Sequence, residues 1–111
     1  MNKNNMCDVD LNMISLNVKG INNYIKRQKI ITWMSRRSPD IIFLQETFST
    51  TKVEKLWLNE WSGYKKIFFS HGSNHSKGVM TLFKNNLECE VKRCVSDDNG
   101  RYVTTDVVIN P

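Results

Sequence analysis

The 111-residue sequence has few of the residues that mark special classes of protein. Three cysteines, five glycines and two prolines exclude a disulfide-dense secreted scaffold, a collagen-like chain and a low-complexity chain. No apolar run approaches the roughly 18 residues of a membrane span, and the polar start MNKNNMCDVD lacks the apolar segment of a signal peptide. These absences favour a reducing intracellular compartment, nuclear or cytoplasmic rather than secreted, and predict no association with a membrane.

The remaining composition is that of an ordinary globular chain of one domain at most. Hydrophobic residues make up 40% of the sequence and charged residues 24%, and the formal net charge is +5. The basic residues cluster most densely within 26–37, at Lys26, Arg27, Lys29, Arg36 and Arg37. On a helix such a cluster is more often a solvated face than a nucleic-acid patch, so it is compatible with a polyanionic partner without requiring one.

The chain begins with a polar segment and then becomes apolar. Residues 1–9 show no hydrophobic periodicity, which predicts a loose N-terminal tail, and residues 10–111 are the predicted folded portion. Four apolar residues within 10–17 predict a strand, and Gly20 ends that run.

A helix and a second strand follow. Segment 23–37 carries an apolar stripe with the 3.6-residue period of a helix, with Asn22 or Asn23 as its cap and Pro39 as its stop. The run 41–44 is too short for a helix and predicts a buried strand. Together these segments predict a strand–helix–strand unit with two parallel strands. The helical stripe consists of Ile30, Ile31, Trp33 and Met34.

A second, shorter helix is predicted over residues 52–61. Thr51 and Glu54 have the spacing of a capping box, in which the two residues cap the start of a helix reciprocally. We expect the tryptophans to belong to the core, because they lie on helical apolar stripes. The tryptophans are Trp33, Trp57 and Trp61, and the stripe of the second helix consists of Val53, Leu56, Trp57 and Trp61.

From residue 64 onward the pattern becomes that of antiparallel strands. Segments 66–70 and 79–83 predict strands around a polar loop, and 88–96 and 101–109 predict a hairpin whose Asn99-Gly100 pair is typical of a type I′ turn. The expected fold class is therefore α+β, with a mixed sheet and flanking helices. Two helices are too few to cover both faces of such a sheet, so the chain is expected to end before a second layer is complete.

Two polar side chains end the two predicted parallel strands. Asn17 ends the first and Glu46 the second, so both should lie at the carboxyl edge, where open α/β sheets bind ligands. A carboxylate there suits Mg²⁺, which needs only one or two protein carboxylates together with phosphate oxygens. A Glu that merely meets solvent is the alternative, and geometry alone favours it. His71 and His75 lie in a polar loop and are weaker metal candidates.

Five ordered segments resemble the endonuclease/exonuclease/phosphatase superfamily, which has the DNase I-like fold. They are MISLNVKG around Asn17, the basic–apolar helix of residues 27–33, DIIFLQET around Glu46, the loop SHGSN followed by SKGV, and NGRYV. The closest likeness is to the endonuclease domains of LINE-type non-LTR retrotransposons, and it covers about residues 10–109. Lys19 and Phe48 depart from the Asn and His that the family often has at these positions.

The resemblance implies a four-layer αββα sandwich, of which this chain supplies the N-terminal portion and ends before the second sheet. It also implies cleavage of phosphate esters with Mg²⁺ or Mn²⁺. By motif match, Glu46 is the metal-binding Glu and Asn17 is the Asn that positions the scissile phosphate and the metal, so both are expected to be catalytic. The family's later Tyr, Asp-x-Asn and Asp-His residues lie downstream, so residues 1–111 alone are expected to be inactive and poorly stable.

Three interpretations of function stay open at this point. The likeness favours a Mg²⁺-dependent endonuclease that nicks target DNA and belongs to a larger retroelement polyprotein with reverse transcriptase. A second interpretation keeps the superfamily but assigns an exonuclease, an inositol-phosphate phosphatase or a sphingomyelinase. The third is a non-catalytic nucleic-acid-binding module, which needs exposed aromatic side chains on a sheet face. Its candidates are Tyr64, Phe68, Phe69 and Tyr102.

Overall fold

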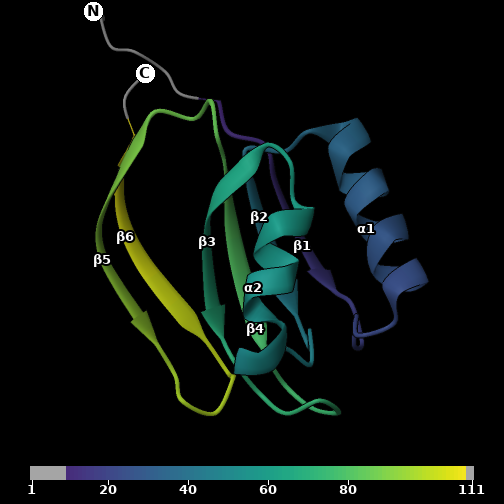
Figure 1. Cartoon of the computed structure of the whole chain (residues 1–111). Coiled ribbons are helices and arrows are strands. Elements are labelled where there is room, and N and C mark those ends of the chain that lie inside the picture. Colours follow the sequence, from purple (N-terminus) through teal and green to yellow (C-terminus); the bar gives the residue numbers. More distant parts are fainter. Residues whose placement is uncertain (1–9, 110–111) are drawn as a thin grey trace, which may run out of the picture.

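Helices and strands alternate in the first half of the chain, and the second half is built of strands (Figure 1). The structure, a computed structural model, describes residues 10–109, so the predicted tail over 1–9 lies outside the described residues. The elements are β1 (Met13–Asn17), α1 (Tyr24–Arg37), β2 (Ile41–Gln45), α2 (Thr51–Glu60), β3 (Tyr64–Ser70), β4 (Val79–Lys84), β5 (Cys89–Ser96) and β6 (Val103–Ile109).

Four strands form a mixed sheet in the order β1-β2-β4-β3. β1 and β2 are parallel and are connected through α1, whereas β4 runs antiparallel to both β2 and β3. β5 and β6 pair with each other in a separate antiparallel sheet of two strands. The predicted α+β class and the mixed sheet are confirmed, and the last hairpin forms a small second sheet instead of extending the first.

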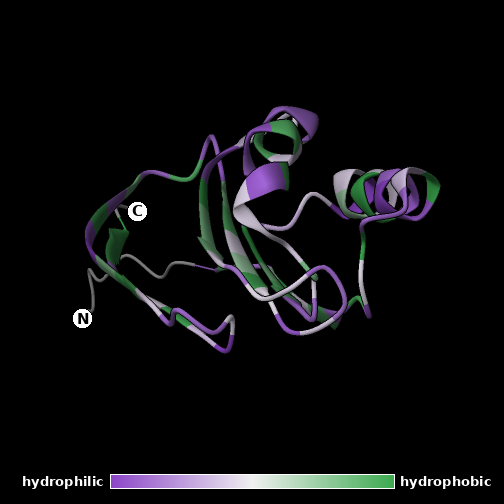
Figure 2. Cartoon of the chain, turned by 60° about the horizontal axis from the view of Figure 1, so that its bottom comes forward, coloured by the Kyte–Doolittle hydropathy of each residue, from purple (hydrophilic) through white to green (hydrophobic). Residues whose placement is uncertain are grey.

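The hydrophobic core lies between the four-stranded sheet and its helices. α1 stands beside β1, α2 lies over the sheet, and the β5–β6 hairpin curves away at the β3 side (Figures 1 and 2). Because side chains alternate between the two faces of a strand, every second residue of the central strands reaches this core. The fully buried members include Ile42 and Leu44 of β2, Met80 and Leu82 of β4, Met34 of α1, and Trp57 of α2 with Trp61 after it.

α1 begins and ends as the sequence predicts. The side chain of Asn23 accepts a hydrogen bond of 2.9 Å from the amide of Lys26, which is a standard N-cap. Ser38 adopts a left-handed φ of 50° at the other end, and Pro39 follows it. Within residues 10–109, neither helix is long and apolar enough to span a membrane.

One tryptophan predicted to belong to the core lies on the surface. Trp33 is 40% exposed, so this prediction was wrong, and Leu56, from the apolar stripe of the second helix, is 54% exposed as well. Trp33 lies beside Leu16 of β1, and β1 is the edge strand, beyond which the sheet has no further strand among the described residues. Periodicity identifies an apolar stripe, but it cannot show how wide a surface the neighbouring elements cover.

The structure buries an arginine that the sequence placed among the solvated charges. Arg27 is 3% exposed, and its Nε and Nη2 donate to the two carboxylate oxygens of Glu60 at 2.5 and 2.9 Å. Its Nη1 donates to the carbonyls of Ile21 and Asn22, both at 3.0 Å. The bidentate ion pair connects α1 to the C-terminal turn of α2. Together with the two carbonyls, it provides the buried guanidinium with hydrogen-bond partners and a neutralising charge.

The predicted capping box at the start of α2 is wrong. The N-cap is Thr50, one residue earlier, and its side chain makes no capping hydrogen bond. Glu54 instead binds the ring of His71 at 2.7 Å. The Glu54 carboxylate, which the local spacing assigned to capping the helix, therefore makes a tertiary contact with His71 instead.

Candidate functional site

One edge of the four-stranded sheet collects the ends of four strands. β1 and β2 end there at Asn17 and Gln45, and the antiparallel strand β4 starts there at Val79. The end of β3, Ser70, pairs with Val79 at the same edge. We call this region the Asn17–Glu46 edge, formed by segments 17–20, 46–50, 71–78 and 97–102.

The side chains of Asn17 and Glu46 meet at this edge. Asn17 Nδ2 donates a hydrogen bond of 2.5 Å to Glu46 Oε2, and Asn17 Oδ1 accepts from the amide of Lys19 at 3.1 Å. Both side chains are exposed. The amide of Asn17 is thus fixed at both ends, and it holds one carboxylate oxygen while the other stays accessible. The expected convergence at the end of two parallel strands is observed.

Backbone hydrogen bonds beyond the strands hold the segment that carries Glu46. The carbonyl of Glu46 accepts from the amide of Gly20 at 2.6 Å, and the amide of Thr47 donates to the carbonyl of Gly78 at 3.1 Å. Glu46 has a left-handed φ of 53°, which turns the chain sharply where the strand ends. At Gly78, φ is +96° and a Cβ would lie 2.5 Å from Thr47 Oγ1, so only glycine fits this contact.

His71 takes part in a network that the sequence did not reveal. Its Nδ1 lies 3.0 Å from Ser49 Oγ and its Nε2 lies 2.7 Å from Glu54 Oε1. His75 contacts its neighbour Asn74 instead, at 2.9 Å. Over residues 10–109 there is no group of three or more His, Cys, Asp or Glu side chains that could hold a metal. His71 therefore links α2 to the loop after β3, and no local spacing rule could have indicated this.

The tip of the β5–β6 hairpin docks on the same edge. The amide of Gly78 donates to the carbonyl of Gly100 at 2.8 Å, and Ser70 Oγ donates to the carbonyl of Asp97. The predicted type I′ turn is wrong, because that turn needs a positive φ at both central residues and only Gly100 of the pair has one. The Asp97 carboxylate bridges the loop by accepting from Arg101 N at 3.1 Å and Nε at 3.0 Å.

The Asp97 carboxylate should make this hairpin tip sensitive to acid. The hydrogen bond from the Arg101 side chain lowers the pKa of Asp97 below its ordinary value of 3.8. Because the folded pKa is depressed, the stabilisation is complete above pH 3.8 and is lost as the pH falls through the lowered value. In an NMR titration, the Arg101 amide and Nε–H signals should shift with a midpoint below 3.8. Asp97→Asn should abolish the transition, and a midpoint above 3.8 would contradict the assignment.

The donor set at the Asn17–Glu46 edge fits a hard divalent cation. Glu46 offers one open carboxylate oxygen, and its other oxygen is oriented by Asn17. Mg²⁺ binds proteins through one or two carboxylates and keeps its remaining positions for water and phosphate oxygens. The second predicted ligand, Asn17, faces Glu46 with its NH₂ group while its oxygen accepts from the amide of Lys19, so in this geometry the amide orients the carboxylate. The role of Asn17 as a metal ligand stays a prediction from the sequence.

The aromatic residues required by a sheet-face binding module are mostly covered. Tyr64 is 4% exposed and its hydroxyl donates to the Pro39 carbonyl at 2.5 Å; burial is the main cause that raises its pKa, with Asp40 adding to it. Phe68 packs edge-to-face on Phe83 at 6.0 Å. Only Tyr102, 50% exposed, stands free of the sheet, so the four residues form no stacking platform.

The sequence of this chain matches a known family over most of its length. Residues 14–111 match the sequence model of the Endonuclease/Exonuclease/phosphatase family. A similar curated protein is the "Transposon TX1 uncharacterized 149 kDa protein" of Xenopus laevis, 33% identical over 93 residues. That alignment covers 84% of this chain and 7% of the relative, so the chain spans a small part of the relative's length.

A solved structure shares the fold. The AP endonuclease LMAP from Leishmania major superposes with a TM-score of 0.66 at 22% sequence identity, covering 86% of this chain and 34% of that protein. At this identity the likeness concerns the fold alone. The match of residues 14–111 to the family's sequence model covers most of the chain, so the chain belongs to the endonuclease/exonuclease/phosphatase family.

Proposed function

We propose that the chain is part of a Mg²⁺- or Mn²⁺-dependent DNA endonuclease domain of a retroelement protein. The observation that carries this proposal is the hydrogen-bonded pair of Asn17 and Glu46 at the carboxyl edge of the sheet. The similarity to a transposon protein favours DNA as the substrate over a phosphoinositide or a sphingolipid. The nuclear or cytoplasmic location and an associated reverse transcriptase stay predictions from the sequence.

In this proposal Glu46 holds the metal ion and Asn17 positions Glu46. A bound Mg²⁺ or Mn²⁺ would supply Lewis-acid stabilisation of charge on phosphoryl oxygens. The chain itself holds the carboxylate in a fixed orientation. Lys19 N–H donates to the Asn17 side-chain oxygen, and the Asn17 NH₂ group donates to the Glu46 carboxylate. Such outer contacts typically change metal affinity or activity by about 10- to 100-fold. We propose that groups outside residues 1–111 activate the attacking water and assist the leaving oxygen.

A paramagnetic metal titration tests the metal site on this chain without requiring turnover. In ¹⁵N-labelled protein, Mn²⁺ at low concentration should broaden the amide signals of residues near Asn17 and Glu46 before any others. Glu46→Gln keeps the shape but removes the charge that a hard cation needs, so it should abolish this selective broadening.

Glu88→Gln is the matched control, because Glu88 is an exposed carboxylate in the connection between β4 and β5, away from the edge. It should leave the broadening at Asn17 and Glu46 unchanged. Selective broadening that survives in Glu46→Gln would refute the metal site.

A further inference from the structure

The outward face of α1 carries positive charge that no acidic residue of the helix offsets. α1 contains five basic residues and no Asp or Glu. Arg27 is neutralised by Glu60, whereas the other four, Lys26, Lys29, Arg36 and Arg37, are exposed. Among the described residues none of these four is in a salt bridge. The unpaired charge therefore faces solvent along the whole length of the helix.

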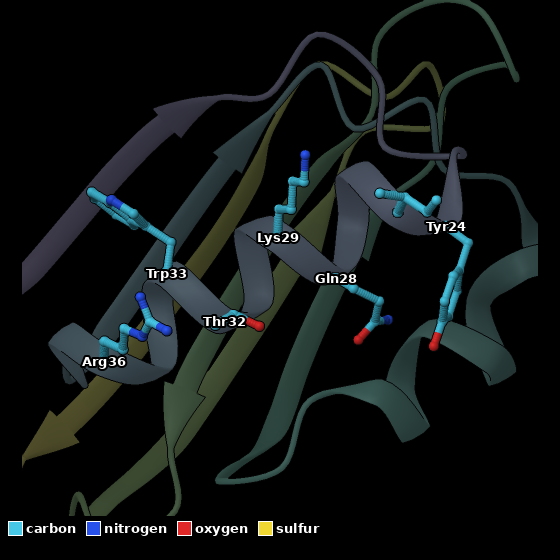
Figure 3. Close-up of a pocket in the computed structure, with 7 residues that line it drawn as sticks. Tyr24, Gln28, Lys29, Thr32, Trp33 and Arg36 are labelled. Atoms are coloured by element: carbon cyan, nitrogen blue, oxygen red, sulfur yellow. The ribbon is translucent and has the colours of Figure 1, made fainter.

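An apolar groove lies beside this charge. Trp33, Ile30 and Leu16 form its floor, and Lys26 and Lys29 flank it, with a volume of about 350 Å³. A second, wider hollow of about 510 Å³ continues from it along α1 and shares Trp33 and Lys29 with it (Figure 3). Arg36 also lines this second hollow. We call the first of these hollows the Trp33 groove.

Trp33 is presented in the groove as an exposed aromatic surface. It is 40% exposed, and the guanidinium of Arg37 covers one face of its ring at 3.6 Å from the centroid, so a base would stack on the other face. Cationic groups beside an accessible aromatic ring are the combination that binds single-stranded nucleic acid, since the cations contact phosphates and the ring stacks on a base. A second copy of this chain is a poor occupant, because its net charge of +5 would repel.

We propose that the Trp33 groove and the adjoining basic face of α1 bind a single strand of DNA. The groove differs from the Asn17–Glu46 edge in position: Leu16 faces the helices, whereas the next residue, Asn17, points to the opposite face of the sheet. α1 starts near that edge and extends about 21 Å from it. A strand that leaves the edge can therefore continue along α1.

The chemistry of the groove favours DNA over RNA. Its charged lining side chains, Lys26 and Lys29, donate hydrogen bonds and accept none, and the rest of the floor is hydrocarbon and indole. A ribose 2′-hydroxyl placed there would find no side-chain acceptor for its proton. This inference rests on the proposed function for the choice of DNA, but not for the presence of the binding surface.

Fluorescence and anisotropy of the 111-residue chain in EDTA test the proposal. Trp57 and Trp61 are each 1% exposed, so quenching of tryptophan emission by a short oligo(dT) would report on Trp33. With a labelled oligo(dT), Trp33→Leu should raise the Kd by roughly tenfold or more, the size expected for one lost base–aromatic stack. Lys29→Gln/Arg36→Gln should weaken binding and lower the slope of log K against log salt by about 1 to 2.

Lys55→Gln/Lys65→Gln is the matched control, since it removes the same charge from exposed positions on α2 and β3. It should change the Kd and the salt slope much less than Lys29→Gln/Arg36→Gln. Because the measurements are made in EDTA, no metal ion at the Asn17–Glu46 edge contributes to binding, and this separates the groove from the metal site. Circular dichroism should be the same for all variants.

Three results would overturn the proposal. One is equal binding by wild type, Trp33→Leu and Lys29→Gln/Arg36→Gln. Another is tighter binding of oligo(U) than of oligo(dT), which would assign the groove to RNA. The last is quenching of Trp33 by vesicles rich in phosphatidylserine but not by oligo(dT), which would assign it to a membrane surface.

Discussion

In the full-length protein, Glu46→Gln should lower the nicking of supercoiled plasmid by roughly 10²- to 10⁴-fold. The expected size corresponds to several kcal/mol of lost transition-state stabilisation, which is what a metal ion supplies at a phosphoryl group. The amide has nearly the same volume and keeps a partner for Asn17, so the circular dichroism spectrum should not change. The measurement is the initial rate of nicking as a function of Mg²⁺ concentration.

A substitution of Asn17 distinguishes the orientation of the Glu46 carboxylate from the binding of the metal ion. Asn17→Ala removes the 2.5 Å hydrogen bond to Glu46 but leaves the carboxylate charge, so it should lower the maximal rate by about 10- to 100-fold and change the Mg²⁺ dependence less than Glu46→Gln does. Glu88→Gln should nick as the wild type does. Nicking by Glu46→Gln at the wild-type rate would refute the role of Glu46 as metal ligand.

Breaking the buried ion pair between α1 and α2 should cause the largest loss of stability. Glu60→Gln leaves the Arg27 guanidinium, 4% exposed at its side chain, without a negative partner. Removing one partner of such a pair typically costs about 3–5 kcal/mol, because the remaining charge is buried and uncompensated. We expect a loss of this size in the free energy of unfolding, measured by urea denaturation.

A double-mutant cycle distinguishes this cause from a general effect of mutation. Arg27→Met removes the charge but keeps an apolar chain, so Arg27→Met/Glu60→Gln should recover much of the loss. Glu90→Gln is the surface control, because Glu90 and Lys92 are each 58% exposed at the side chain and such pairs contribute little. If Glu60→Gln lowered the free energy of unfolding no more than Glu90→Gln does, the ion pair between Arg27 and Glu60 would not be what stabilises the packing of α1 against α2.

The local elements could be predicted from the sequence because their determinants are local. The cap of α1 rests on Asn23 and its stop on Pro39, and neither depends on distant residues. β2 was predictable from an apolar run after a proline. The boundaries of the other strands moved by up to three residues, as for β1, which starts at Met13 instead of residue 10, because pairing partners decide where a ladder ends.

The candidate site was predictable in part for a topological reason. Once β1 and β2 are joined by a helix they run parallel, so Asn17 and Glu46 must end at the same edge. The division of roles that we propose within the pair was not predictable, because it depends on which atom of the Asn17 amide faces Glu46. The contact of Lys19 N–H with Asn17 Oδ1 decides this.

The sequence by itself determined the family, the strand–helix–strand start and the pair at its edge, because motif order and hydrophobic period are properties of the chain. Only the tertiary structure decided the fate of three charged or aromatic side chains. Arg27 is buried because it forms an ion pair with Glu60 of α2. Glu54 does not cap its own helix, because its carboxylate is hydrogen-bonded to His71. Trp33 is exposed because β1, beside it, is an edge strand. In each case the outcome depends on residues distant in sequence, and local periodicity carries no information about them.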